Sequence, residues 1–200
     1  MNQGLVDRIN AVVKPGDEVY CFGDFSLNYQ GAEMVKYLNG TWYLIPGNHD
    51  KCHTVFHKDR EEKRNNSFKQ YADMGFVILP ERFSFILRKG DKQINAQACH
   101  FPFKEDHGNF EHTPRYQKYR PNPTFLTQVL LHGHVHNAWK SRQFWFEEEK
   151  RFIPQINLGV DAWDWRPISE EELFDFCEKE IAEASEMSDV MNGEVLNEDT

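Results

Sequence analysis

Short apolar runs recur along the chain, and four of them lead into side chains that can bind a metal ion. Runs of this length, rich in branched and aromatic residues, predict buried strands. In α/β folds, ligands bind at the carboxyl ends of such strands, so we expect these polar residues to converge. The runs are residues 19–22 before Gly23-Asp24, 42–45 before Gly47-Asn48-His49-Asp50, 94–99 before His100, and 129–131 before Gly133-His134-Val135-His136.

The spacing of the other apolar residues predicts the remaining elements. Leu5, Ile9 and Val12 recur at helical spacing, and Lys89-Gly90-Asp91 is typical of a hairpin turn. Residues 58–64 are densely charged and indicate a solvated helical face. The predicted helices cover residues 2–13, 31–38 and a stretch after Pro167, and the further strands cover 76–79, 83–87, 93–99, 144–146 and 152–156.

The last predicted helix starts at a capping box, in which Ser169 is followed three residues later by Glu172. From Ser185 onward the chain is acidic and weakly apolar, a composition that favours disorder. We therefore predict one domain over residues 1–184 and an acidic, disordered tail over 185–200.

Composition narrows the class of protein. A chain of 200 residues suits one domain with a sizeable core. Asp and Glu outnumber Lys and Arg by 32 to 23, which argues against broad attraction to nucleic acid. The four cysteines show no metal-type or disulfide-framework spacing, and no apolar run is long enough to span a bilayer. We expect a cytoplasmic protein with no membrane partner.

In their order along the chain, Gly23-Asp24, Gly47-Asn48-His49-Asp50, His100 and Gly133-His134-Val135-His136 resemble the motifs of the calcineurin-like metallophosphoesterases. Taken alone, Gly47-Asn48-His49-Asp50 is equally typical of a plain turn. The resemblance extends from about residue 17 to residue 173. It implies an α/β fold of two packed, mixed β-sheets flanked by helices, and hydrolysis of a phosphomonoester or phosphodiester at two divalent metal ions.

The resemblance also implies a role for each site residue. Asp24 corresponds to the carboxylate that bridges the two ions, and Asn48, His100 and His134 complete the second metal site. His136 would reach the first metal. His49 would steady the phosphate or protonate the leaving oxygen, and Asp50 would orient the loop. Mixed imidazole, carboxylate and amide ligands suit Mn, Fe, Zn or Ni, of which we favour Mn.

The remaining histidines receive structural roles. His132 directly precedes the metal-binding pair and is expected to be packed or to support the ligands. We expect the others to lie on the surface, namely His53, His57, His107 and His112.

One motif of the family is missing from this sequence. The family begins with an Asp-x-His motif after its first strand, and no Asp-x-His occurs here. We therefore expect the fold to lack its first strand, leaving a free sheet edge. The first metal would keep only Asp24 and His136. Either the sequence is an N-terminal truncation of a working enzyme, which we favour, or it has lost the reaction and kept the scaffold.

Two further alternatives stay open. A nuclease is possible but not favoured, because basic residues between Arg115 and Arg120 support it and the overall acidity opposes it. A non-catalytic protein that keeps one metal site is the rival from another class. Residues 101–123 form a long irregular stretch that is either a lid over the substrate or a variable insertion. The oligomeric state is not determined by the sequence.

Overall fold

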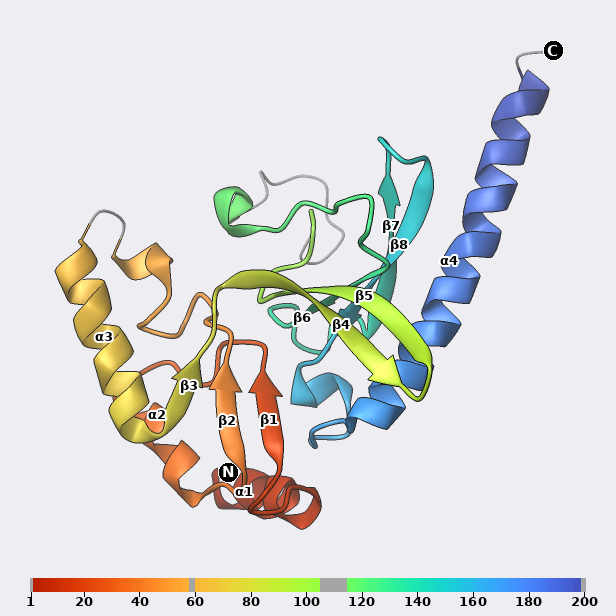
Figure 1. Cartoon of the computed structure of the whole chain (residues 1–200). Coiled ribbons are helices and arrows are strands. Elements are labelled where there is room, and N and C mark those ends of the chain that lie inside the picture. Colours follow the sequence, from red (N-terminus) through yellow and green to blue (C-terminus); the bar gives the residue numbers. More distant parts are fainter. Residues whose placement is uncertain (1, 58–59, 105–114, 199–200) are drawn as a thin grey trace.

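The computed structural model describes residues 2–57, 60–104 and 115–198. Its first half forms a parallel three-stranded sheet in the order β1-β2-β3 (Figure 1). Helical segments connect these strands, as parallel pairing requires. The elements are α1 (Asn2–Val12), β1 (Glu18–Cys21), α2 (Tyr29–Ala32), the 3₁₀ turn η1 (Glu33–Tyr37), β2 (Thr41–Leu44), η2 (Thr54–Phe56), α3 (Glu61–Met74) and β3 (Phe76–Ile78).

The second half forms a mixed five-stranded sheet in the order β4-β5-β6-β8-β7. The hairpin β4–β5 is antiparallel, with Lys89 opposite Lys92, and β5, β6 and β8 run parallel to one another. Two sheets flanked by helices confirm the predicted fold class. The elements are β4 (Arg82–Lys89), β5 (Lys92–Cys99), η3 (Gln117–Tyr119), β6 (Val129–His132), β7 (Ser141–Phe146), β8 (Arg151–Asn157), η4 (Val160–Ala162) and α4 (Glu170–Glu198).

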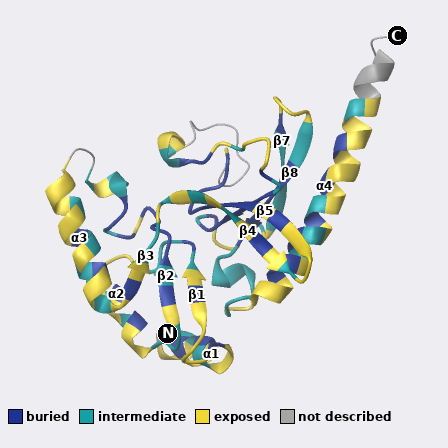
Figure 2. Cartoon of the chain, in the orientation of Figure 1, coloured by how far each residue is buried: buried dark blue, intermediate teal, exposed yellow. Residues whose placement is uncertain are grey.

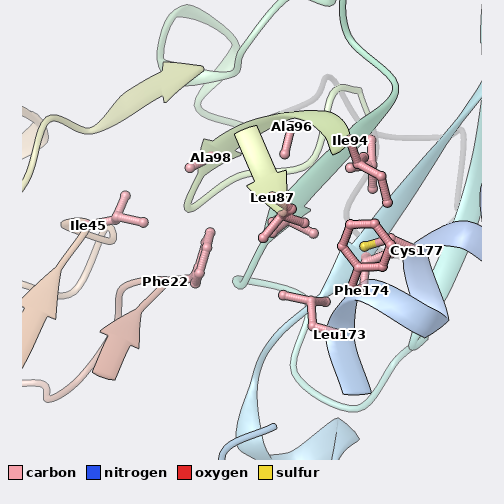
Figure 3. Close-up of a cluster of buried hydrophobic side chains, with 12 residues drawn as sticks. Phe22, Ile45, Leu87, Ile94, Ala96, Ala98, Leu173, Phe174 and Cys177 are labelled. Carbon is pink, nitrogen blue, oxygen red and sulfur yellow. The ribbon is translucent and has the colours of Figure 1, made fainter. Parts of the chain in front are cut away.

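The main hydrophobic core joins the two sheets at the level of the site. Phe22 and Ile45, which follow β1 and β2, pack in one cluster with Leu87 and Ala98 of the second sheet and with Phe174 of α4 (Figure 3). Phe22 and Ile45 immediately precede the predicted metal-binding turns of the first sheet. Their burial therefore fixes where those turns meet the second sheet.

The helix α4 extends through the segment that we predicted to be disordered. It continues unbroken across residue 184 to Glu198 (Figure 1), and Figure 2 shows buried positions at intervals along it. Ala184 and Ser188 are buried, and the Ser188 hydroxyl accepts a hydrogen bond from the backbone N–H of Phe152 at 2.8 Å. The prediction of disorder from Ser185 was wrong because it rested on acidic composition. Small residues one turn apart allow the helix to lie close to β8, while Glu183, Glu186 and Asp189 are exposed.

A large groove runs beside β1. Its volume is about 1370 Å³, and its apolar walls come from α1, β1, β4 and the start of α4, including Ile9, Phe85 and Leu173. Asp24 and His134 also line the groove. β1 and β4 are the terminal strands of their sheets, so within the described residues no strand pairs with the outer edge of β1. In the same residues, no helix has the length and apolarity needed to cross a membrane.

Candidate metal centre

Four strand ends deliver polar side chains to one place, as the sequence predicts. β1 leads to Asp24, β2 to Asn48, β5 to His100 and β6 to His134. Single ligand atoms of Asp24, His100 and His134 all lie within 4.8 Å of one another. Asn48 joins them, because its Oδ1 is 3.1 Å from Nε2 of His100.

The orientation of His100 is that of a possible metal ligand. Its Nδ1 donates to the backbone carbonyl of Phe22 at 2.7 Å, which directs Nε2 toward the other ligands. Nε2 is 3.1 Å from Asn48 Oδ1 and 3.3 Å from Asp24 Oδ2, and both oxygens are acceptors. Ligand atoms ~2.0–2.2 Å from a shared ion lie roughly 3–3.5 Å apart. The donor set therefore fits a divalent metal.

Close approach of the loops depends on glycine. A Cβ built on Gly23 would lie 2.5 Å from Nδ1 of His100 and 2.6 Å from the backbone nitrogen of Gly47. Gly23 also has φ +87°, a conformation that other residues rarely adopt. Only glycine at this position lets the turn after β1 touch both the turn after β2 and the imidazole of His100.

The site holds several residues in the left-handed conformation that ordinary side chains disfavour. Asp24, His134 and His136 have φ values of 55°, 69° and 49°, and Tyr116 has φ 61°. Each such residue costs on the order of 1–3 kcal/mol and persists only when its surroundings over-determine it. Among the described residues, four of the seven non-glycine residues with positive φ belong to this one region, a clustering that is typical of functional sites.

Asp24 is held as a carboxylate. Burial opposes its ionised form, but the contact with His100 and the hydrogen bond from the backbone N–H of His49 outweigh burial and lower its pKa. That N–H donates to Oδ1 at 2.8 Å, while Oδ2 faces His100. The His49 side chain is 49% exposed, and its Nε2 is 4.0 Å from Asp24 Oδ2. His49 is thus at the rim of the centre and open to solvent.

Asp50 ties the loops together. Its carboxylate accepts backbone N–H bonds from Gly47 at 2.8 Å, Asp24 at 2.7 Å and Phe25 at 3.1 Å. Burial is the largest influence on the pKa of Asp50 and raises it to about 6, although these N–H groups favour the charged form. The side chain is fully buried. Its contacts are those of a residue that holds the turns after β1 and β2 in register.

A family model described as calcineurin-like phosphoesterase matches residues 2–176. The chain belongs to the calcineurin-like phosphoesterase family. Members of this family are metal-dependent phosphoester hydrolases, and the group of Asp24, His100 and His134 agrees with that chemistry. No curated protein and no solved structure matches the chain.

His136, the remaining predicted metal ligand, lies outside the group of Asp24, His100 and His134. The His136 side chain is 72% exposed, and its Nδ1 is 3.6 Å from Oδ2 of Asp161. Asp161 lines the same groove as Asp24 and His134. We did not single out Asp161 from the sequence, where it appears only as the end of the segment after β8. Its contact with His136 is the signal that places it at the site.

The other histidines divide into buried and partly exposed residues. His132 is buried as expected, and burial lowers its pKa to about 3. His53 contradicts our prediction of a surface residue, because it is only 1% exposed and packs edge-on against Phe101 and Tyr119. These rings lie far from His53 in the sequence, so no local pattern indicates its burial. His57 is half-buried, and His107 and His112 lie outside the described residues.

The described parts of the irregular stretch approach the metal centre through aromatic rings. Phe101 packs against His134 at 4.8 Å between ring centroids and stacks on Tyr116 at 5.1 Å. Tyr116 in turn meets His134 edge-on at 5.9 Å. Phe101 and Tyr116 therefore form an aromatic wall beside His134. The lid prediction for the whole stretch also involves residues 105–114, which lie outside the described part of the chain.

Proposed function

We propose that this phosphoesterase hydrolyses a phosphomonoester or phosphodiester at two divalent metal ions, with manganese favoured. The observation that carries the proposal is the convergence of Asp24, Asn48 and His100 around one point, with Nε2 of His100 turned toward two oxygen acceptors. When bound, the metals lower the pKa of water to supply a nucleophile and neutralise charge on the phosphoryl oxygens. Asp24, Asn48, His100 and His134 would hold the second ion.

His49 is the residue we assign to the substrate. Its backbone is fixed by the hydrogen bond to Asp24, while half of its side chain faces solvent. An imidazole titrates near neutrality, so it can hold a phosphate oxygen or give a proton to the leaving oxygen. Asp50 acts through the backbone of the loop, by fixing the turn on which His49 lies.

The first ion has fewer protein ligands. Asp24 and His136 are the candidates from the sequence, and Asp161 is a carboxylate close enough to His136 to join them. The groove beside β1 supports a further source. In this sheet, helical segments connect β1 to β2 and β2 to β3, and α1 precedes β1 in the same manner. A strand placed before α1 would fill the groove, pair with β1 and bring its carboxyl end to the metal centre.

Manganese binding and hydrolysis of chromogenic phosphoesters test the proposal. His134→Ala should reduce bound manganese, because it removes a ligand. His49→Ala should leave the metal content unchanged and lower turnover by about 10²–10⁴, as expected for an acid–base group. Equal loss of metal in both variants would contradict the assignment of His49. A stoichiometry of one ion per chain, without turnover at millimolar manganese, would favour the non-catalytic alternative.

The choice of substrate and compartment rests on weaker features. The net charge of −9 counts against a nuclease, whereas Arg115 and Lys118 beside Tyr116 count for one. Comparing a chromogenic diester with single-stranded DNA distinguishes the two. All four cysteines are free thiols, which supports a reducing cytoplasmic setting.

A further inference from the structure

The segment between β3 and β4 crosses from one sheet to the other (Figure 1). Two consecutive residues of this crossing contact different walls of the site. Glu81 bonds to the segment that follows His49, and Arg82 donates from Nη1 to the carbonyl of Arg120 at 3.2 Å. The crossing therefore links the loop after β2 with the stretch that carries Tyr116. None of the motifs in the sequence points to Glu81.

Glu81 holds its neighbour with both carboxylate oxygens. Oε1 accepts the backbone N–H of Thr54 at 2.7 Å, and Oε2 accepts the Thr54 hydroxyl at 2.8 Å. His53 adds a third contact, with its Nε2 3.5 Å from Oε2. Because His53 Nδ1 accepts the N–H of Val55, its Nε2 carries the ring proton and presents it to Glu81. The Glu81 side chain is 19% exposed, so these contacts are largely shielded from water.

A continuous series of turns connects this anchor with His49. The N–H of Asp50 donates to Gly47 at 3.1 Å, that of His53 donates to Asp50 at 2.9 Å, and that of Phe56 donates to His53 at 3.2 Å. Each turn shares a residue with the next, so the turns connect the far end to the near end through backbone hydrogen bonds. His49 lies inside the first of these turns, and Glu81 accepts hydrogen bonds from Thr54 in the last.

We propose that Glu81 is a positioning residue that holds the His49 imidazole at the rim of the metal centre. This assignment rests on the proposed function, because it gives His49 a role in turnover. A residue that only stabilised the fold would lower turnover equally in the original chain and in the His49→Ala variant. Glu81 acts specifically on the turns that carry His49, whereas His100 is oriented independently by the carbonyl of Phe22.

The carboxylate should be replaceable in part by an amide. In Glu81→Gln, the amide oxygen can accept the Thr54 N–H, and the amide NH₂ can donate to the hydroxyl, which turns to accept it. Only the contact with His53 is lost. Glu81→Ala removes all three contacts and leaves the N–H of Thr54 without its acceptor.

A double-mutant cycle tests the action through His49. In manganese-loaded protein, Glu81→Ala should lower kcat by about 10–100-fold with KM and metal content unchanged, the effect of a displaced catalytic group. In the His49→Ala background the same change should cost less than about twofold, because residues acting as a unit are non-additive. Fully additive losses overturn the proposal. If His49→Ala costs nothing by itself, the proposed function of His49 fails, and amide exchange decides the role of Glu81.

Amide hydrogen exchange measures how firmly Glu81 holds these turns, and it does not require turnover. Glu81→Ala should speed exchange at the His49 and Asp50 amides by roughly tenfold, while Glu81→Gln stays near the original chain. Glu62→Ala, at an exposed position of α3, is the matched control and should change neither amide. If Glu81→Ala unfolds, Thr54→Val removes one of the three contacts and should give an intermediate effect. Unchanged exchange at His49 in Glu81→Ala or Thr54→Val overturns the proposal.

Discussion

Replacing Asp50 tests the account of how the two turns of the first sheet are held together. Three backbone N–H groups, those of Gly47, Asp24 and Phe25, depend on its carboxylate. A buried donor that loses its acceptor costs ~1–3 kcal/mol. With three donors affected, and water entering to satisfy some of them, Asp50→Ala should lower the free energy of unfolding by about 3–6 kcal/mol. That is a large part of the ~5–15 kcal/mol typical of a domain.

The amide variant separates hydrogen bonding from side-chain volume. Oδ2 serves Asp24 and Gly47, and Oδ1 serves Phe25. In Asp50→Asn, the carbonyl oxygen can keep the first two donors, while the NH₂ group faces the N–H of Phe25. One donor is lost, so the expected cost is about 1–3 kcal/mol.

Urea unfolding followed by tryptophan fluorescence gives both values from the midpoint and slope of the transition. Asp73→Asn, at an exposed position of α3, is the matched control and should stay within about 0.5 kcal/mol of the original chain. An Asp50→Ala variant within about 1 kcal/mol of the original chain would refute the reasoning. So would equal costs for the alanine and asparagine variants, since their difference measures the retained hydrogen bonds.

Three other predictions concern the glycine turn, the last helix and the groove. Gly23→Ala should abolish manganese binding, measured by calorimetry, because the new Cβ would overlap His100; unchanged affinity would contradict the packing described here. The pKa of Glu172 is lowered to about 2, mainly by its hydrogen bond with Arg166. The original chain should therefore melt at a higher temperature than Glu172→Gln. This difference should be largest above about pH 5 and should shrink as the pH falls toward 2, and a constant difference would contradict the prediction. Adding a strand and an Asp-x-His motif before α1 should raise the melting temperature and the activity at micromolar manganese. If the extended chain gains neither, the groove does not bind a strand.

Local pattern by itself determined the elements and the order of the site motifs. The strand ends could be predicted because each is a short apolar run that stops at glycine, proline or histidine, and this depends only on neighbouring residues. The capping box at the start of α4 is also local. Its Ser169 hydroxyl accepts the N–H of Glu172 at 3.2 Å, and the Glu172 carboxylate accepts the N–H of Ser169 at 3.0 Å.

Only the tertiary structure decided how distant residues meet. His53 looked like a surface residue because no pattern around it in the sequence marks it as buried, yet Phe101 and Tyr119 from another part of the chain cover it. The last turns of α4 looked disordered by composition, yet Ser188 bonds to β8. Glu81 has no sequence signal, because a single carboxylate acquires meaning only from the donors that the fold places around it. Contacts of this kind depend on which strands pair and how the two sheets pack, and a pattern of period two or 3.6 contains no information about either.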